Sequence, residues 1–257
     1  MKLHVVTRGD GPDLVLLHGW SMDSAIWGEF AEALCPHFRL HLVDLSGHGR
    51  SPRVAPLSID SMATAVASIV PPRSLLCGWS LGGMVSMHLA AVQPALPRGL
   101  VLIGTTPRFS SGHDWPHGTP ADALASFAAE LDADPQTLLA RFRASMCRSD
   151  PQERKLRRLM SSLPPAPADL TAFREGLDVL QNTDLRDDTK RIASPVLVIH
   201  GGRDTVVPAG AAVWLAQRID RARLHLIDEC THLPFLSRAE DCAALVRQFA
   251  SEIESFK

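Results

Sequence analysis

The 257-residue sequence predicts an α/β protein with a mostly parallel central sheet, helices on both faces and an inserted helical lid. Three observations predict it. Short apolar runs alternate with helical patterns over residues 1–106 and again over 191–257. Residues 107–190 between them show helical patterns and prolines but no clear strand. The composition, 46% hydrophobic and 21% charged, is enough for one large core. We therefore expect a single sheet domain that is split by a cap.

The individual elements follow from these runs. Four apolar runs in the first half predict strands at 14–17, 40–43, 74–77 and 100–103. Helical patterns between them predict helices at about 23–35, 58–70 and 81–93. In the second half, strands are predicted at 195–199 and 224–227, with helices at 208–219 and 238–254. Continuous apolar runs are typical of parallel strands buried on both faces, and strand–helix alternation indicates crossover units. We expect roughly four helices in the insertion.

Charge and composition exclude several classes of protein. The 26 basic and 28 acidic residues nearly balance, and a nucleic-acid-binding protein would normally carry a clear basic excess. No apolar run approaches the ~20 residues of a membrane-spanning helix, and the N-terminal residues do not form a signal peptide. The five cysteines show no paired spacing, so neither a disulfide framework nor a metal site is indicated. We expect a cytoplasmic protein with reduced thiols.

The strongest motif is Gly78-Trp79-Ser80-Leu81-Gly82, which fits the pattern G-x-S-x-G directly after a predicted strand and before a predicted helix. A sharp strand-to-helix turn exposes the serine hydroxyl at the carboxyl edge of the sheet, and the glycines leave room for the strained backbone. The alternative is a glycine-rich turn that contains a serine by chance. The flanking elements favour Ser80 as a nucleophile.

A serine nucleophile needs a general base, and in this arrangement the chain order is serine, acid, histidine. His200, His225 and His232 follow Ser80 in the second half of the sheet domain. The first two lie in apolar strand runs, which favours structural roles for them. His232 lies in the loop after the last predicted strand, so we predict it as the base, the alternative being a solvated loop histidine.

Two aspartates compete for the role of the acid. Asp204 lies in the loop after the strand that ends at His200, at the same edge of the sheet as the serine. Asp228 also ends a strand, but it is close in sequence to His232 and could instead orient that loop. We favour Asp204, which would hold the imidazole tautomer and stabilise the imidazolium. Its structural alternative is capping of the helix near 208.

An oxyanion hole requires two backbone donors. One is expected from Leu81, the residue after the nucleophile, and the other from Trp20 in the loop after the first predicted strand. His18 in the same loop is expected to brace it. Asp44 and His48 lie in another loop at this edge, and a bracing network is favoured over a catalytic role for them.

Taken together, these motifs resemble the α/β-hydrolase superfamily over essentially the whole chain. They are His18-Gly19-Trp20, Asp44 to Ser51, Gly78 to Gly83, Gly202-Arg203-Asp204 and Thr231 to Phe235. More narrowly, the chain resembles the family of pimeloyl-[acyl-carrier protein] methyl ester esterases of biotin synthesis. That resemblance is carried by Trp20, Trp79, Leu40 to Leu45, Asp114-Trp115-Pro116 and Thr183 to Arg186. The sequence departs from the family pattern at Thr231 and Leu233, the two residues that flank His232. The family usually has alanine before this histidine and often has alanine or glycine after it.

The insertion carries a local basic excess. Between Arg141 and Arg158 there are seven basic residues against two acidic ones, on a chain of net charge −2. Such a patch would attract an acidic partner in a salt-sensitive way, the alternative being a solvated helix face. The family resemblance implies that the partner is an acyl-carrier protein bearing the substrate. The expected docking residues are Arg141, Arg148, Arg154, Lys155, Arg157 and Arg158.

The same resemblance implies that five consecutive residues of the insertion line the acyl channel. They are Phe142, Arg143, Ala144, Ser145 and Met146. Phe142 and Met146 are four residues apart and would share one face of a helix. For Met146, ordinary packing of the lid is an equal alternative.

The resulting expectation is a monomeric serine carboxylesterase that needs no metal or organic cofactor. By the resemblance, it would hydrolyse the methyl ester of pimeloyl-[acyl-carrier protein] to pimeloyl-[acyl-carrier protein] and methanol, and small free esters should also react. One alternative is a generic esterase, thioesterase or C–C hydrolase with a different acyl group. A non-catalytic binding protein is the other, and it would be expected to lack one of the three catalytic residues.

Overall fold

The central element of the computed structural model, which describes residues 2–164 and 170–254, is a seven-stranded sheet in the order β1-β3-β2-β4-β5-β6-β7. The strands are β1 (Val5–Arg8), β2 (Asp13–Leu17), β3 (Arg39–Val43), β4 (Ser74–Trp79), β5 (Pro97–Ile103), β6 (Val196–Gly201) and β7 (Ala222–Ile227). All neighbours are parallel except β1, which pairs antiparallel with β3. The sequence did not indicate β1, because this half-exposed edge strand has no continuous apolar run.

The parallel register aligns the carboxyl ends of the inner strands. Leu17 of β2 lies beside Val43 of β3 and Gly78 of β4, and Ile103 of β5 lies beside Trp79 of β4. The loops that follow these strands therefore start at one edge of the sheet. In an open α/β sheet this edge is where a site forms.

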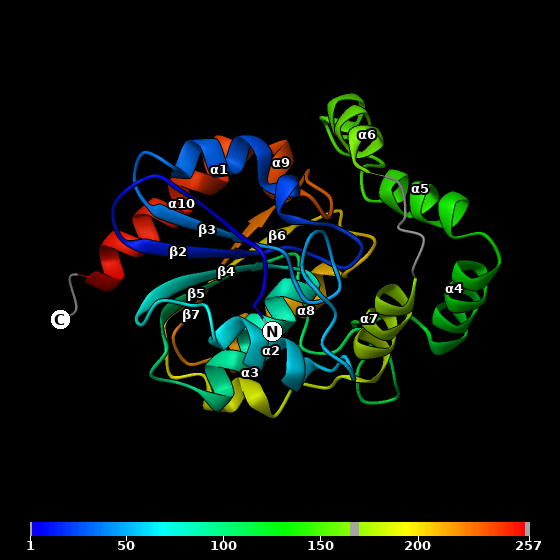
Figure 1. The fold of residues 1–257 in the computed structure, drawn as a ribbon, viewed down its shortest axis with the longest axis horizontal. Helices are drawn as coiled ribbons and strands as arrows, with labels where there is room; N and C mark the ends of the chain where they lie inside the picture. Colours follow the sequence, from blue (N-terminus) through cyan, green and yellow to red (C-terminus); the bar gives the residue numbers. More distant parts are fainter. Residues whose placement is uncertain (1, 165–169, 255–257) are drawn as a thin grey trace.

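Helices cover both faces of the sheet (Figure 1). One face carries α1 (Gly28–Leu34), α9 (Pro234–Ser237) and α10 (Ala239–Glu254). The other carries α2 (Ile59–Ala67), α3 (Leu81–Val92) and α8 (Ala209–Arg218). Each face buries its own hydrophobic cluster against the sheet, so the strands are apolar on both sides as the continuous runs indicated.

The segment between β5 and β6 is helical and lies to one side of the sheet (Figure 1). Its helices are α4 (Ala121–Ala133), α5 (Pro135–Ser145), α6 (Glu153–Ser162) and α7 (Thr171–Asn182), followed by the short 3-10 helix η2 (Asp188–Arg191). Asp134 accepts a hydrogen bond from the Thr137 N–H, and Pro135 follows it, so α5 starts with a capped first turn. Residues 165–169 of this segment, with 1 and 255–257, lie outside the described residues.

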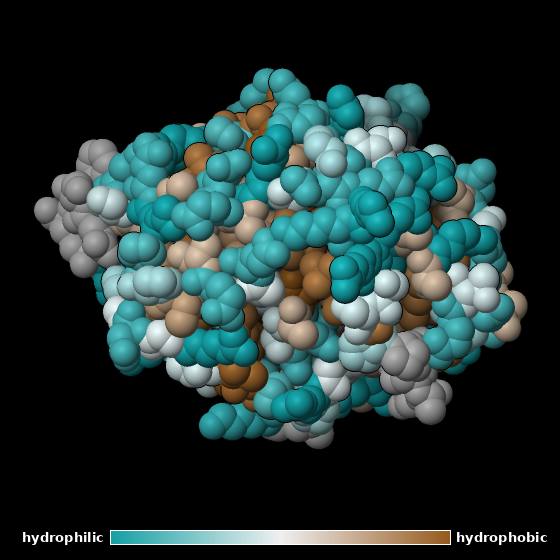
Figure 2. Space-filling view, turned by 90° about the horizontal axis from the view of Figure 1, so that it is seen from above, coloured by the Kyte–Doolittle hydropathy of each residue, from teal (hydrophilic) through white to brown (hydrophobic). Residues whose placement is uncertain are grey.

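The polarity of the surface, the length of the helices and the grouping of metal-ligating side chains concern the kinds of partner that the protein could bind. Seen from the side of α1 and α6, the surface is mostly hydrophilic, with small hydrophobic patches between polar side chains (Figure 2). In the described part of the chain, no helix is both long and apolar enough to cross a membrane. Nor do three or more His, Cys, Asp or Glu side chains among residues 2–164 and 170–254 gather in a way that could hold a metal ion.

Candidate active site

Ser80 occupies the turn between β4 and α3 with an unusual backbone conformation. Its φ is 54° and its ψ is −117°, in the left-handed half of the map that side chains rarely adopt. The turn is possible because Gly78 and Gly82, two residues before and after Ser80, have no side chains. A Cβ atom on Gly78 would lie 2.3 Å from the Gly82 carbonyl oxygen, and one on Gly82 would lie 2.0 Å from the Leu17 carbonyl oxygen. The packing of this turn therefore explains both glycines of the motif.

His232 and Asp204 come together from different loops. The Nδ1 atom of His232 lies 2.7 Å from Oδ2 of Asp204, and both side chains are almost completely buried. Burial alone would raise the pKa of Asp204, but the His232 ring and its hydrogen bond outweigh this and lower the pKa below its ordinary value. Asp204 also accepts hydrogen bonds from the backbone N–H groups of Val206 and Val207. The carboxylate is thus held in its charged form.

The contacts of His232 assign its tautomer. Because Asp204 is a charged acceptor, Nδ1 carries the proton and Nε2 keeps a lone pair. Ser80 and His232 line the same narrow cavity of about 20 Å³. Trp79 lines it too, and its indole N–H donates to the His232 carbonyl oxygen at 3.0 Å. Nε2 is therefore the nitrogen that can take a proton from Ser80.

The other candidates for the acid and the base are Asp228, His225 and His200, and they have different surroundings. Asp228 and His225 are exposed at the edge strand β7 and the turn after it. His200 is fully buried beside Asp204, with its Nε2 2.9 Å from the Val207 carbonyl oxygen. Burial lowers the pKa of His200, which keeps it neutral. The structure thus brings Asp204, and not Asp228, to His232.

The two residues expected to supply the oxyanion donors are Leu81, which follows Ser80 in the chain, and Trp20, which lines the cavity that contains Ser80. Leu81 is the first residue of α3, where backbone N–H groups have no carbonyl partner within the helix. The Trp20 loop packs against Ser80, because a Cβ on Gly19 would lie 3.2 Å from the Ser80 Cβ and 3.0 Å from the Trp79 ring. The Trp20 side chain lines the same cavity as Ser80.

His18, Asp44 and His48 form a bracing network around these loops. His18 Nδ1 donates to the Gly19 carbonyl oxygen at 2.8 Å, and its Nε2 accepts from the Leu45 N–H at 3.0 Å. Asp44 accepts from the backbone N–H groups of Ser24 and Arg50. His48 Nδ1 lies 3.0 Å from the Ser46 carbonyl oxygen, and its ring stacks on Phe173.

A larger cavity of about 420 Å³ extends under the helices α4, α5 and α7. It shares with the cavity at Ser80 the residues Trp20, Phe109, Phe142, Leu180 and Val206. Phe109, Leu180 and Val206 were not predicted from the sequence, because their roles depend on how the insertion folds over the sheet edge. Trp79 could have been suspected from its position next to Ser80.

The five predicted channel residues point in different directions. Phe142 and Met146 line the cavity at Ser80, and Ser145 joins Phe142 in the larger cavity. Arg143 instead lines a groove between the insertion and the loop after β3. Ala144 faces a second groove, between α5 and α6. Two side chains of the five therefore lie away from the reacting atoms.

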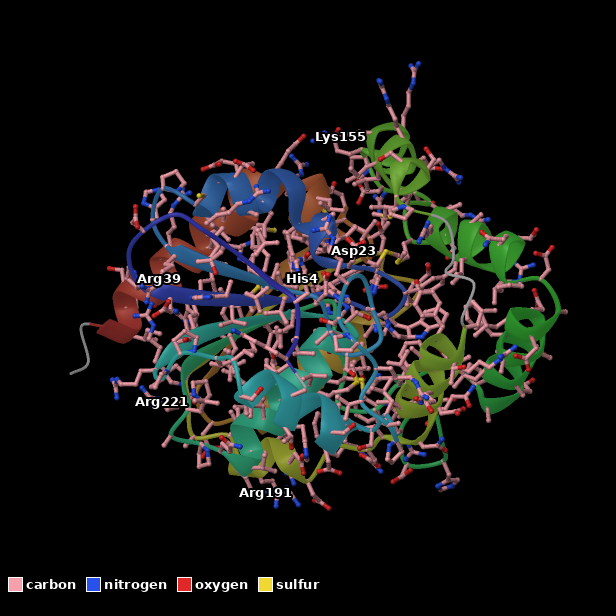
Figure 3. The ribbon with its side chains drawn as sticks, in the orientation of Figure 1. His4, Asp23, Arg39, Lys155, Arg191 and Arg221 are labelled. Carbon is pink, nitrogen blue, oxygen red and sulfur yellow. The ribbon has the colours of Figure 1, made fainter. Side chains whose placement is uncertain are left out.

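The basic residues of the insertion are partly neutralised. Arg141 pairs with Glu130, Lys155 with Glu29 of α1 at 2.6 Å, and Arg157 with Glu153 at 2.7 Å. Arg148, Arg154 and Arg158 are exposed and have no ion-pair partner within the described ranges. Figure 3 shows Lys155 on the side of α6 that faces α1. The free positive charge is therefore smaller than the sequence count suggests.

The fold and this arrangement define the class of protein. A sequence model of the α/β hydrolase family matches residues 14–245. Among solved structures, an esterase from Exiguobacterium antarcticum superposes with a TM-score of 0.86 at 22% identity, covering 98% of this chain and 95% of that one. A bromoperoxidase from Bacillus anthracis gives a TM-score of 0.86 at 19% identity, covering 97% and 95%. These two likenesses concern the fold alone.

The chain belongs to the α/β hydrolase family, and its curated relatives specify a group within it. The pimeloyl-[acyl-carrier protein] methyl ester esterase of Nitrosomonas europaea is 44% identical over 93% of this chain and 96% of its own length. The esterase of the same name from Chromobacterium violaceum is 34% identical over 99% of both chains. That from Xanthomonas campestris is 36% identical over 98% of this chain and 100% of its own length.

Proposed function

We propose that this protein is a serine esterase that hydrolyses the methyl ester of pimeloyl-[acyl-carrier protein], releasing pimeloyl-[acyl-carrier protein] and methanol in biotin synthesis. The observation that carries the proposal is the meeting of Ser80 and His232 in one cavity, with Asp204 on the second nitrogen of the imidazole. The relatives with this activity in their names supply the substrate, since they are 34–44% identical to this chain over nearly its full length.

The reaction proceeds in two halves. Ser80 Oγ attacks the ester carbonyl carbon while His232 Nε2 takes its proton, and Asp204 stabilises the imidazolium. The Trp20 and Leu81 N–H groups donate to the oxyanion. The tetrahedral intermediate collapses, and His232 returns the proton to the departing methanol. Water then enters, gives its proton to His232 and attacks the acyl-enzyme, which releases the free carboxylate and regenerates Ser80.

The shape of the cavities suits a long acyl chain. The narrow cavity at Ser80 accommodates little more than the ester group, and the larger cavity beside it is lined mainly by apolar side chains. Arg141 and Arg148 also line that larger cavity. An acyl chain would lie along the apolar wall, and its carrier would remain outside near the arginines.

We assign the cap role to residues 107–190 and the core to 1–106 and 191–257.

The basic residues of the cap support an acidic carrier protein as the partner. Arg148, Arg154 and Arg158 present positive charge that the described residues do not pair: Arg148 lines the larger cavity from the turn after α5, and Arg154 and Arg158 are exposed on α6. Charges of this kind raise the association rate with an acidic surface, in a salt-dependent way. We further propose that the protein acts as a cytoplasmic monomer, without a cofactor, on carrier-bound and small free esters.

The proposal is tested by comparing kcat/KM for the carrier-bound methyl ester and for a small free ester at about 20 mM and about 500 mM salt. We expect a preference of about 100-fold or more for the carrier-bound ester at low salt, falling steeply at high salt. Equal values with no salt dependence would leave a serine esterase but remove the carrier protein from the proposal.

The nucleophile is tested by Ser80→Ala. Turnover of both esters should fall by at least about 10⁴-fold, because the hydroxyl that forms the acyl-enzyme is missing. The variant should still bind the carrier-bound ester, since the cavity and the cap are unchanged. A rate near that of the wild type would overturn the assignment of Ser80.

A further inference from the structure

A buried carboxylate outside the triad connects the cap to the loop that carries His232. Asp150 lies between α5 and α6, and only 5% of its surface is exposed. Its Oδ2 accepts from the backbone N–H of Thr231 at 3.1 Å, and its Oδ1 accepts from the Ser237 hydroxyl at 2.6 Å. The Gln152 N–H also donates to Oδ1, at 2.8 Å. A buried carboxylate requires such donors, so its position is fixed by them.

Thr231 makes a second bond to the same cap segment. Its hydroxyl oxygen lies 2.7 Å from the Met146 carbonyl oxygen and 3.2 Å from Asp150 Oδ2. A hydroxyl has a single proton, and the shorter contact assigns it to Met146. The backbone N–H and the side chain of Thr231 are therefore both held by cap residues, which are Asp150 and Met146. Thr231 is only 2% exposed, so water does not replace these bonds readily.

The segment from Met146 to Asp150 also contacts the loop that carries the acid. The guanidinium of Arg203 donates to the Ser149 carbonyl oxygen at 3.3 Å, and the Arg203 N–H donates to the Cys230 carbonyl oxygen at 2.9 Å. One cap segment thus touches the residue directly before His232 and the residue directly before Asp204. Met146 itself lines the cavity that contains Ser80 and His232.

We propose that Asp150 is a positioning residue for the esterase reaction, because it holds the backbone at Thr231 and thereby the imidazole of His232 between Asp204 and Ser80. The inference rests on the proposed serine esterase function and adds to it a residue that touches no reacting atom. Thr231 and His232 share a peptide unit, so a displacement of one moves the other. Misplacement of a catalytic group by about 1 Å can cost 10²-fold in rate.

The test uses hydrolysis of p-nitrophenyl acetate, which needs the triad but not the carrier protein. In Asp150→Ala, kcat per titrated active site should fall about 10- to 100-fold, with KM changed less than about threefold. Asp150→Asn should lose less, because its amide oxygen can still accept from Thr231. The control is Asp178→Ala, which removes an exposed aspartate of the cap helix α7 and should leave kcat unchanged.

Two further measurements separate positioning from a purely structural role. The proton on His232 Nδ1 should give a low-field NMR resonance in the wild type that shifts or broadens in Asp150→Ala and not in Asp178→Ala. Thr231→Ser should keep nearly full activity and Thr231→Val should lose activity, since only serine keeps the hydroxyl that donates to Met146. Unfolding midpoints measured in parallel establish that each assayed variant is folded.

The outcomes distinguish a failure of the positioning role of Asp150 from a failure of the proposed esterase function. A folded Asp150→Ala variant with wild-type kcat and an unchanged resonance would overturn the positioning role. A lower unfolding midpoint with unchanged kcat would also overturn it and leave Asp150 as a structural contact only. A wild-type protein that hydrolyses no ester would instead overturn the proposed function.

Discussion

At the scale of single residues, the role of each buried histidine depends on which ring nitrogens its neighbours occupy. His18 has backbone partners on both nitrogens, and protonation would bring its Nε2–H against the Leu45 N–H. His232 has Asp204 on Nδ1, and its ring borders the cavity that contains Ser80. Both side chains are buried, yet only the second arrangement leaves a nitrogen able to accept a proton from the serine. The two histidines therefore differ not in burial but in the partner of Nε2, because the Leu45 N–H occupies this nitrogen in His18.

The role of Asp204 is tested by Asp204→Asn. The amide can donate to His232 and would stabilise the wrong tautomer, so kcat for a small ester should fall by about 10⁴-fold. Asp228→Asn is the matched control, because Asp228 is an exposed aspartate four residues before the same histidine. Steady-state kinetics on both variants check this. The opposite pattern, with loss in Asp228→Asn alone, would make Asp228 the acid.

At the scale of elements, the turn from β4 to α3 shows how a strained residue is kept in place. Ser80 donates its N–H to the Ile103 carbonyl oxygen at 3.0 Å, and its own carbonyl accepts from the Thr105 hydroxyl and from the N–H groups of Gly83 and Met84. These bonds tie the turn to β5 and to the first turn of α3. The strain at Ser80 is therefore compensated by hydrogen bonds to α3 and to the end of the neighbouring strand β5.

Gly82→Ala tests this close packing. The new Cβ would lie 2.0 Å from the Leu17 carbonyl oxygen, a backbone atom that cannot move without displacing β2. We expect a loss of about 2–3 kcal/mol in the free energy of unfolding, together with lower activity. Gly99→Ala in β5 is the comparison, because its Cβ would meet only the ends of flexible side chains at 3.0–3.4 Å. Urea unfolding of both variants provides the measurement, and equal losses would contradict the expectation.

The cap helix α6 carries its charge on one side. Leu156 and Met160 are buried on one face of the helix, whereas Arg154 and Arg158 are exposed on the opposite face. This pattern gives α6 an apolar face toward the protein and a basic face toward solvent. A helix of this kind can present charge to a partner without any change in the packing beneath it.

Reversal of these two charges, Arg154→Glu with Arg158→Glu, should lower kcat/KM for the carrier-bound ester about 10- to 100-fold at low salt, mainly through slower association. The rate with p-nitrophenyl acetate should not change. Arg221→Glu serves as a control, because Figure 3 shows Arg221 on the opposite side of the molecule from α6. If the double variant keeps the wild-type rate on the carrier-bound ester, α6 is not the docking surface.

At the scale of the whole molecule, the loops at the sheet edge contain buried histidines that resist protonation. Burial lowers the pKa of His18 from 6.5 to about 4 and that of His48 from 6.5 to about 3. Between these values and 6.5 the unfolded chain binds protons that the folded chain does not. The free energy of unfolding therefore decreases as the pH falls through this range.

This dependence is measured by urea unfolding at pH 7 and pH 5. Each of the two histidines should contribute a slope of up to about 1.4 kcal/mol per pH unit. His18→Gln should reduce the slope by about that amount, since glutamine does not titrate. His37→Gln, at an exposed position, should leave the slope as it is. A wild-type stability that is flat between pH 7 and pH 5 would show that these histidines titrate normally.

Much of the fold follows from local patterns in the sequence. The inner strands β2, β4, β5 and β6 appear as continuous apolar runs, because they are buried on both faces, whereas the edge strand β7 shows only the shorter run Leu224–Ile227. The edge strand β1 was missed, since a half-exposed strand leaves no such run. Ser80 stands out because a strained turn requires glycines at fixed distances from it. His232 and Asp204 stand out because they lie in loops that follow parallel strands, and such loops start at the same edge of the sheet as Ser80.

By itself the sequence determined the fold class, the family and the residues that could perform the chemistry, because these depend on periodicity and on motifs within short stretches of chain. Only the tertiary structure decided which residues meet. It brought Asp204 rather than Asp228 to His232, turned Arg143 and Ala144 away from the reacting atoms, and placed Asp150 of the cap against Thr231. The physical reason is that these contacts join residues far apart in the chain, so no local pattern encodes them.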